Sequence, residues 1–218
     1  MSELNQLLLN FNHKQNFNYN DFYVSSSNYY PFKLIETWPN WEKNIVNIYG
    51  EKNSGKSHLI GIFKQKNNAK IINDNYFVNN DIKTLKAYEN IILDNFQNQI
   101  DEKTLYSLIN LVDQDNKYLI ITSRKPIISY NFELNDLISR INNLLLAEIK
   151  NPDDDLIFAL IVKNFSDKQI KIEKKLIEFI VKRIDRSYRK ISEFIYKIDE
   201  ISLKRKKPID LKTIKELI

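Results

Sequence analysis

The eight residues from Gly50 to Ser57, GEKNSGKS, restrict the fold of this chain more than any other feature of its sequence. They match the P-loop pattern, in which two glycines, a lysine and a hydroxyl residue follow a strand and open a helix. The flanking residues meet that requirement, because the β-branched run 44–49 precedes the motif and the apolar segment 59–63 follows it. The motif predicts a strand, a phosphate-binding loop and a helix in immediate succession.

The residue types in this octapeptide suit the binding of a nucleotide's phosphates. Backbone amides of a P-loop point at phosphate oxygens, and the helix that follows contributes its positive end. Lys56 would add a point charge near the terminal phosphates, and the hydroxyl of Ser57 would ligate magnesium. A chance turn is disfavoured, because two of the chain's only three glycines occupy the required positions, whereas glycine averages about 7% of residues. The expected phosphate-binding residues are Gly50, Glu51, Lys52, Asn53, Ser54, Gly55, Lys56 and Ser57.

A second half of the site is expected on another strand, because magnesium needs a carboxylate in addition to the P-loop hydroxyl. The run IILD at residues 91–94 supplies one at the end of a β-branched segment. Such runs are common in α/β proteins, and it is the pairing with the P-loop that favours Asp94 as a metal ligand. The next residue is Asn95, whose amide cannot accept a proton from an attacking water. We therefore expect at most a weak ATPase activity of the chain alone.

Short β-branched runs alternate with longer amphipathic segments through the middle of the chain. Each run is nearly continuously apolar, as in a parallel sheet with both faces covered. Between two of them, residues 104–116 place Leu105, Leu108, Ile109 and Val112 at helical spacing. The pattern predicts an α/β fold with a five-stranded parallel P-loop sheet and helical crossovers. The expected strands are residues 44–49, 70–73, 90–93, 118–122 and 144–149.

The residues before the first expected strand differ in composition. Residues 1–20 combine the apolar patch LLL at 7–9 with an Asn-rich stretch, which cannot bury enough surface to fold alone. We expect a flexible amino-terminal arm there. Residues 21–41 are rich in aromatic side chains and contain two prolines, without helical or strand periodicity. We expect irregular chain packed on the α/β domain, which would span residues 21–150.

The pattern becomes helical after the last expected strand. The motif NPDDD at residues 151–155 is expected to start a helix, with Asn as its cap and Pro at its first position, because capping and macrodipole preferences agree there. Apolar residues then recur three or four apart over residues 176–198, with a break near residues 185–187. We expect a small helical lid domain over residues 151–218.

The charge is unevenly distributed along the chain. The net charge is +5, and residues 151–218 carry 17 Lys and Arg against 12 Asp and Glu, whereas residues 1–150 carry 16 of each. Clustered basic residues are the electrostatic signature of nucleic-acid binding. Solvated lysine faces on helices are the commoner cause of such a surplus. We therefore expect any contact with DNA to be weak or indirect.

The inventory of side chains excludes several classes of function. The chain contains no cysteine and only two histidines, which rules out disulfides, thiolate nucleophiles and His/Cys zinc sites. Any metal must therefore sit on oxygen ligands. No stretch approaches the ~20 apolar residues of a membrane span, and the amino terminus lacks the features of a signal peptide. We expect a cytoplasmic protein without a membrane partner.

Taken together, these motifs resemble the AAA+ domain of the DnaA family of bacterial replication initiators, and more closely its short Hda-type members, the regulatory inactivators of DnaA. The similarity spans nearly the whole chain and rests on GKSHL at residues 55–59, LDN at residues 93–95 and ITS at residues 121–123. It implies that His58 joins the nucleotide site. It also implies that the bound cofactor is ADP or ATP with Mg²⁺.

Two further segments carry arginines to which the resemblance gives a role. LISRI at residues 137–141 resembles the segment that bears an arginine finger. Arg140 would then reach a neighbouring subunit's nucleotide and stabilise charge on the transferred phosphoryl group. DRSYR at residues 185–189 resembles the lid segment that bears a sensor arginine, so Arg189 would reach the bound phosphates. A solvated surface arginine is the alternative for each.

The amino-terminal sequence QLLLNF at residues 6–11 resembles the short peptide through which such inactivators bind the DNA sliding clamp, the β subunit of DNA polymerase III. An extended peptide would place Leu9 and Phe11 in an apolar pocket while Gln6 fixes the register, and the polar arm behind it would give reach. The clamp-binding residues that the resemblance implies are Gln6, Leu7, Leu9 and Phe11.

The chain departs from the family pattern in two places. Arg124 stands where the family has an aspartate, and it is followed by Lys125-Pro126, which puts the usual water-orienting arrangement in doubt and further disfavours self-hydrolysis. The initiators also continue beyond the lid into a helix-turn-helix domain, whereas this sequence stops at Ile218. We therefore expect no reader of origin DNA.

The resemblance implies a nucleotide-binding regulator of replication initiation that is tethered to the sliding clamp. It would donate Arg140 to ATP-bound DnaA and so promote hydrolysis of that ATP. Two alternatives stay open: a stand-alone AAA+ ATPase in which Asn95 is tolerated, and a DNA-binding replication accessory factor that uses the basic helical unit. Self-association of the chain is a further open question.

Overall fold

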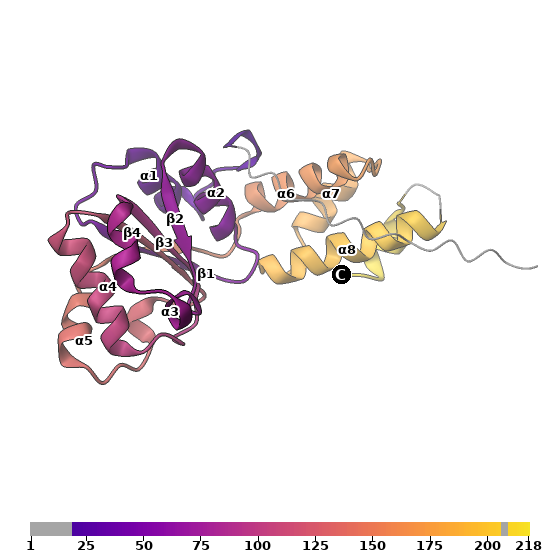
Figure 1. Ribbon diagram of the computed structural model, residues 1–218. Helices are drawn as coiled ribbons and strands as arrows, with labels where there is room; N and C mark the ends of the chain where they lie inside the picture. Colours follow the sequence, from indigo (N-terminus) through magenta and orange to yellow (C-terminus); the bar gives the residue numbers. More distant parts are fainter. Residues whose placement is uncertain (1–18, 206–208) are drawn as a thin grey trace, which may run out of the picture.

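The computed structural model describes residues 19–205 and 209–218, and Figure 1 shows an α/β half joined to a group of helices. The described strands are β1 Ile45–Gly50, β2 Ala69–Ile72, β3 Asn90–Phe96, β4 Tyr118–Ser123 and β5 Leu145–Ile149. The described α-helices are α1 Tyr29–Thr37, α2 Lys56–Lys66, α3 Tyr76–Asn79, α4 Glu102–Gln114, α5 Asn135–Ile141, α6 Asp154–Asp167, α7 Lys174–Val181, α8 Tyr188–Arg205 and α9 Leu211–Lys215. Short 3-10 helices are η1 Tyr19–Asp21, η2 Ile82–Ala87 and η3 Ile127–Ser129.

The five strands form one parallel sheet in the order β2-β3-β4-β1-β5. The sequence-based prediction of an α/β fold with a five-stranded parallel sheet is confirmed, and each strand begins within one residue of its expected start. The β-branched runs fit this position because side chains on both faces of the central strands are buried. Ile91 and Leu93 belong to the core on one face, and Ile92 belongs to the core on the other. This alternation is what a parallel sheet covered on both sides requires.

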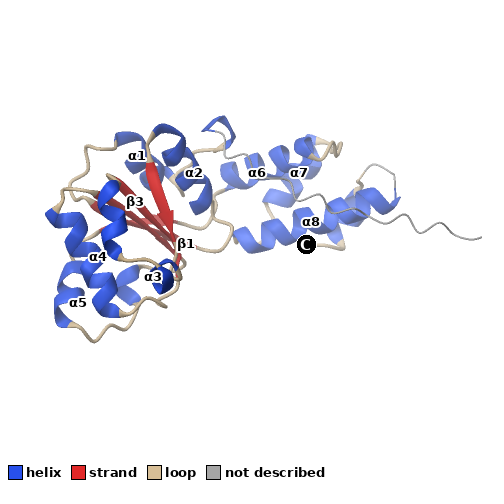
Figure 2. Cartoon of the chain, viewed as in Figure 1, coloured by secondary structure: helices blue, strands red, loops and turns tan. Residues whose placement is uncertain are grey.

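Helices cover both faces of the sheet, as Figure 2 shows. Helices α4 and α5 supply buried residues to one core, and α1 and α2 supply buried residues to the other. A third cluster of buried apolar side chains comes entirely from residues 157–214, in the helices that follow the sheet and the segments that connect them. Leu156 and Tyr188, at the starts of α6 and α8, pack with the second core instead. These two residues connect the helical part to the α2 side of the sheet.

Two local expectations were wrong. Residues 29–37 form α1 rather than irregular chain, with Pro31, Leu34 and Ile35 buried. Proline is tolerated in the first turn of a helix, where its missing N–H has no intrahelical acceptor to satisfy, so its presence did not exclude a helix. The second correction concerns α6, whose cap is Asp153 rather than Asn151, because the Asp153 carboxylate accepts a hydrogen bond from the Leu156 amide at 2.9 Å.

The expected break near residues 185–187 is confirmed, since α7 ends at Val181 and α8 begins at Tyr188. Helix α9 is capped by Asp210, whose carboxylate accepts from the Thr213 amide at 2.8 Å. Within residues 19–205 and 209–218, no helix is long and apolar enough to cross a membrane.

Candidate nucleotide-binding site

The loop of residues 50–57 leaves the carboxyl end of β1 and enters α2, as its motif predicts. Two of its positions admit only glycine. A Cβ added to Gly50 would lie 2.8 Å from the backbone oxygen of Ile149 on β5, closer than real Cβ atoms approach. Gly55, the cap residue of α2, has φ 97°, a left-handed conformation that side chains disfavour. The close strand and the left-handed turn are therefore the physical reason for the glycine spacing.

Lys56 folds back over this loop. Its ammonium donates hydrogen bonds to the backbone oxygens of Gly50 and Glu51, both at 2.8 Å. The pKa of Lys56 is lowered to about 8, first because burial disfavours the charged form and then because the positive charge of Arg124 repels it. The carboxylates of Asp94 and Glu51 oppose this shift. The Lys56 ammonium also donates to the Ser54 hydroxyl at 3.4 Å, and a partly desolvated cation whose hydrogen-bond partners are all neutral oxygens is suited to receive an anion.

Asp94 lies near the end of β3 and is held by the neighbouring strand. The Thr122 hydroxyl on β4 donates a hydrogen bond to Asp94 Oδ1 at 2.6 Å. It also accepts one from the backbone N–H of Asn95 at 2.7 Å. Asn95 itself has φ 55°, and the β3–β4 register shifts between Leu93 and Phe96 at this point. The turn and the hydroxyl together fix the carboxylate. The sequence indicated the strand that carries Thr122 but not this contact.

The residues expected to hold Mg²⁺ fit that ion in chemistry. Ser57 and Asp94 offer a hydroxyl and a carboxylate, which are the hard oxygen ligands that Mg²⁺ prefers. The described part of the chain contains no group of three or more His, Cys, Asp or Glu residues that could hold a metal by itself. A sparse set of protein ligands is typical of sites where substrate phosphates and waters complete the coordination of Mg²⁺.

The side chain of Glu51 turns away from the loop and towards the helical part. Its carboxylate accepts a hydrogen bond from the Ser187 hydroxyl at 2.6 Å and another from the Tyr188 amide at 2.9 Å. The second contact satisfies an amide at the start of α8, which has no acceptor inside the helix. Glu51 was predicted as one of the phosphate-binding residues. In the structure its main chain meets Lys56 while its side chain holds α8.

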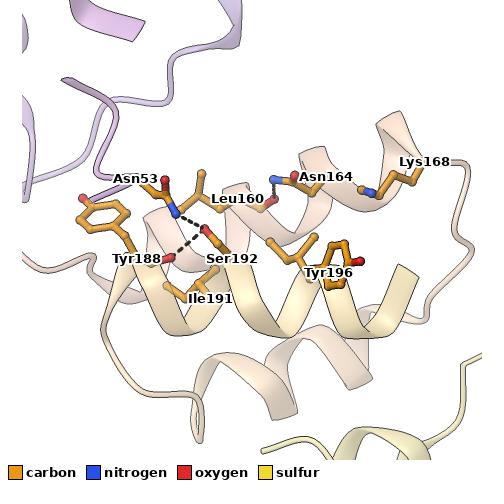
Figure 3. Close-up of a pocket in the computed structure, with 9 residues that line it drawn as sticks. Asn53, Leu160, Asn164, Lys168, Tyr188, Ile191, Ser192 and Tyr196 are labelled. Atoms are coloured by element: carbon orange, nitrogen blue, oxygen red, sulfur yellow. Dashed lines mark hydrogen bonds between the residues drawn. The ribbon is translucent and has the colours of Figure 1, made fainter. Parts of the chain in front are cut away.

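A groove of about 240 Å³ opens beside the tip of the loop, between α6 and α8. Figure 3 shows Asn53 of the loop at one end of it, with the Asn53 amide 3.5 Å from the Ser192 hydroxyl. Tyr188 lines the groove, and burial raises the pKa of its phenol to about 12, so the hydroxyl stays protonated. The remaining lining residues are Leu160, Asn164, Lys168, Ile191, Ser192, Ile195 and Tyr196.

His58 directly follows the loop and packs against Phe22. Its ring meets the ring of Phe22 edge-on, with 5.2 Å between the ring centres. A Cβ added to Gly55 would lie 3.3 Å from the same Phe22 ring. The segment before α1 therefore forms one wall of the site. Phe22 was not among the predicted site residues, because a single aromatic residue in an aromatic-rich stretch gave no signal.

The two arginines named by the family resemblance are both exposed, and each is paired with an acidic side chain. Arg140 is exposed on α5 and pairs with Asp113 of α4, with 2.7 Å between Nη1 and Oδ2. In Figure 1, α5 lies on the side of the sheet opposite to α1 and α2. Arg189 is exposed on α8 and pairs with Glu193 one turn along the same helix, at 2.8 Å. Neither arginine is hydrogen-bonded to a residue of the loop among the contacts of the described chain.

The four residues predicted to bind the clamp, Gln6, Leu7, Leu9 and Phe11, lie outside the described part of the chain. Within the described part, the sheet order, the loop after β1, the acidic residue of β3 and the helices after β5 are those of an AAA+ fold.

Sequence comparisons connect this fold to replication initiators. No family model matches the chain. DnaA of Borreliella afzelii is 23% identical over 211 residues, which cover 85% of this chain and 44% of that protein. DnaA of Caldanaerobacter subterraneus is 25% identical over 198 residues, which cover 80% of this chain and 45% of that protein. The chain thus spans less than half the length of these curated relatives.

Solved structures agree with the sequence comparison. Domain III of Thermotoga maritima DnaA has a TM-score of 0.74 at 19% identity, with 93% of this chain and 95% of that chain covered. A DnaA structure with AMPPCP and single-stranded DNA has a TM-score of 0.67 at 18% identity, with 86% of this chain and 67% of that chain covered. The fold of this chain is therefore a DnaA-like AAA+ fold.

Proposed function

We propose that this chain binds an adenine nucleotide with Mg²⁺ at the loop of residues 50–57. The support is the geometry of Lys56, a desolvated cation held over the loop by two carbonyl oxygens. The similar DnaA structure described above contains AMPPCP, an adenine nucleotide analogue. Mg²⁺ would neutralise phosphate charge there, with Ser57 and Asp94 as its protein ligands. The groove between α6 and α8 lies beside the same loop, and Asn53 of the loop lines it.

We further propose that the chain is a regulator of replication initiation of the Hda type, which promotes hydrolysis of the ATP bound to DnaA. The observation that carries this proposal is the position of Arg140, exposed on α5 and paired with Asp113 rather than with the chain's own loop. An arginine in that position is available to another subunit. Asn95, next to Asp94, lacks the proton-accepting group of a general base, which favours slow hydrolysis by the chain itself.

The proposal is tested by reconstitution with purified components. ATP-loaded DnaA, sliding clamp on DNA and this protein are mixed, and release of phosphate is followed with time. We expect hydrolysis of the DnaA-bound ATP to accelerate only when all three components are present. The same rate with and without this protein would remove the regulatory proposal and leave nucleotide binding as a separate question.

The clamp tether is proposed to be the peptide at residues 6–11, within an arm of residues 1–20 in front of the α/β domain (21–150) and the lid (151–218). Replacing Gln6 and Phe11 together by alanine should remove affinity for the clamp, because the anchoring side chain and the register contact are both lost. Binding is measured by surface plasmon resonance on immobilised clamp. Asn10→Ala, within the same peptide, is the matched control and should bind as the wild type does. Normal binding by the double variant would contradict the assignment.

Nucleotide affinity should depend on pH because the pKa of Lys56 is about 8 in the free folded chain. A bound phosphate favours the ammonium form and raises this pKa, so binding above pH 8 takes up a proton. Affinity should then fall by up to about tenfold per pH unit above 8, until the pKa of the complex is reached. Calorimetry at pH 9 in two buffers of different ionisation enthalpy measures the proton uptake directly.

The same group has the opposite effect on the stability of the nucleotide-free chain. The ordinary lysine pKa is 10.5, so between about pH 8 and 10.5 the unfolded chain binds more protons at this site than the folded chain. The contribution of Lys56 to stability therefore rises with pH in that window.

For the calorimetry of nucleotide binding, equal heats in the two buffers at pH 9 would show that Lys56 does not change its protonation when the nucleotide binds.

A stand-alone ATPase is the second candidate, and the hydrogen bond from Thr122 to Asp94 favours it because it holds the acidic group in place. In that case the purified chain alone should turn over ATP at a rate that Asp94→Ala abolishes. A DNA-binding accessory function is the third candidate, based on the basic surplus after residue 150. It predicts an affinity for DNA that falls steeply as salt concentration rises, because the release of counterions from the DNA then contributes less to the free energy of binding.

A further inference from the structure

Helix α5, which carries Arg140, is held at its start by a side chain from another helix. Its cap residue, Leu134, supplies no side-chain hydrogen bond to the first turn. The backbone amides at this point are satisfied by Glu102, the first residue of α4. Oε2 of Glu102 accepts from the Leu134 amide at 2.7 Å and from the Glu133 amide at 3.0 Å, and Oε1 accepts from the Glu133 amide at 2.9 Å. One carboxylate of α4 thus binds the two amides that lead into α5.

The packing of α5 on α4 also has an apolar part. Leu137 and Ile141, one turn apart on α5, are buried. They belong to the same core as Leu105 and Leu108 of α4, which lies beside α5 in Figure 1. Apolar contacts are non-directional, so they select the face of α5 that turns inward without fixing its position along that face. Hydrogen bonds have a preferred geometry, and those to an ionised carboxylate are about twice as strong as neutral ones, so Glu102 fixes where the first turn of α5 lies.

The ion pair near the other end of α5 cannot place Arg140 at a partner's nucleotide. Arg140 pairs with Asp113, in the last turn of α4. To reach phosphate oxygens of another subunit, the guanidinium has to leave Asp113 of its own chain. After that, the position of the guanidinium depends on the backbone of α5 and on the contacts that hold this helix.

We propose that Glu102 is a positioning residue for Arg140, which holds the start of α5 and thereby sets where the guanidinium projects towards a partner's nucleotide. This inference rests on the proposed arginine finger. Leu134 and Arg140 are six residues apart, about 9 Å along a helix at 1.5 Å per residue, so a tilt at the start of this short helix reaches Arg140 directly. A misplacement of about 1 Å in a catalytic group can cost about 10²-fold in rate, even when the change lies outside the reacting atoms.

The test measures phosphate release from ATP-loaded DnaA, with clamp on DNA, as a function of the concentration of wild type, Glu102→Ala or Glu102→Gln. In Glu102→Ala we expect the maximal acceleration to fall by about tenfold to a hundredfold. The concentration that gives half of the maximum should stay unchanged, because no exposed contact side chain is replaced. Glu102→Gln should recover most of the acceleration, since its amide oxygen can still accept from both backbone amides, as Oε2 does.

Two comparisons separate positioning from a general effect on folding. A smaller folded fraction would raise the concentration needed for half of the maximum and leave the maximum itself intact, which is the opposite of the expected result. Circular dichroism follows the melting of each variant, and the ADP affinity of Glu102→Ala should equal that of the wild type. Glu133→Ala is the matched control, because it removes an exposed carboxylate at the same junction and keeps the backbone amide that Glu102 binds. It should accelerate hydrolysis as the wild type does.

The outcomes for Glu102 and for the finger are distinguishable. An equal maximal acceleration by wild type and Glu102→Ala, with Arg140→Ala inactive, would overturn the role of Glu102 and leave the finger intact. Acceleration by Arg140→Ala equal to that of the wild type, or none by the wild type, would overturn both. If Glu102→Ala does not fold, Glu102→Asp takes its place, because it keeps the charge and draws the carboxylate back by one methylene. The maximum should then fall as well, and an unchanged maximum would overturn the inference.

Discussion

Replacing Arg140 by alanine is expected to abolish the acceleration of hydrolysis of DnaA-bound ATP while nucleotide and clamp binding stay as in the wild type. An arginine finger supplied in trans is worth about 10³ to 10⁵ in rate in well-studied nucleotidases, so the loss should be large. The fold should be unaffected, because Arg140 is exposed and exposed ion pairs such as its pair with Asp113 contribute only about 0–1 kcal/mol. The measurement is phosphate release in the reconstituted mixture of clamp on DNA, ATP-loaded DnaA and the variant.

Two controls make this experiment specific to the guanidinium. Asp113→Ala removes the ion pair and leaves the arginine, so it should stimulate DnaA as the wild type does. Arg186→Ala removes another exposed arginine, one that pairs with Asp154 at 2.8 Å, and should also stimulate. Arg140→Lys should not restore activity, because an ammonium lacks the planar fork. Equal stimulation by wild type and Arg140→Ala would refute the finger.

Replacing Lys56 by alanine should abolish nucleotide binding, because the loop loses the charge that it places over the phosphates. The wild type should gain thermal stability with nucleotide, about 2.7 kcal/mol at a ligand concentration 100 times the dissociation constant, and the variant should gain none. Without nucleotide the difference should be small, since burial already disfavours the Lys56 ammonium in the free chain. Differential scanning fluorimetry with and without ADP measures both quantities.

Lys64, which is exposed on α2 and lies outside the loop, provides the matched control for this experiment. Lys64→Ala removes a lysine from the helix that follows the loop without removing a contact to the loop's carbonyl oxygens, so it should keep the nucleotide-dependent shift. An ADP affinity of Lys56→Ala equal to that of the wild type would remove the assignment of residues 50–57 as the phosphate loop.

The strands could be predicted because their signal is local. The runs that form β1, β3 and β4 are mostly buried on both faces, so their composition alone distinguished them from the surrounding helices. Helix α1 was missed because its aromatic residues and Pro31 obscure the helical period. The start of α6 was misplaced because both Asn151 and Asp153 can cap a helix, and only tertiary structure decides between them. Asp153 also accepts a hydrogen bond from Ser26, which a sequence pattern does not show.

The features of the site likewise divide into those that a local sequence pattern predicts and those that depend on tertiary contacts. The glycines and Lys56 were found from spacing, since a P-loop is contiguous in sequence. The contacts of Thr122 with Asp94 and of Glu51 with α8 join residues 28 and 137 positions apart, so no local pattern could indicate them. Arg189 pairs with Glu193 in the structure, a contact that its motif did not indicate, and its reach towards bound phosphates stays a prediction. The direction of an exposed side chain depends on neighbours one helical turn away as much as on its motif.

Because α8 is attached to Glu51 at its first residue, a movement of the loop would also move the distant, carboxyl-terminal end of α8. Helix α8 has 18 residues, and at 1.5 Å per residue it is about 27 Å long. Its first turn is anchored to the residue whose backbone oxygen also accepts from Lys56. A rotation of about 10° at this anchor would displace the other end of the helix by about 5 Å, by simple geometry on that length. A small rearrangement of the loop would thereby displace the carboxyl-terminal end of α8 by a larger distance, and a partner protein bound at that end would respond to the displacement.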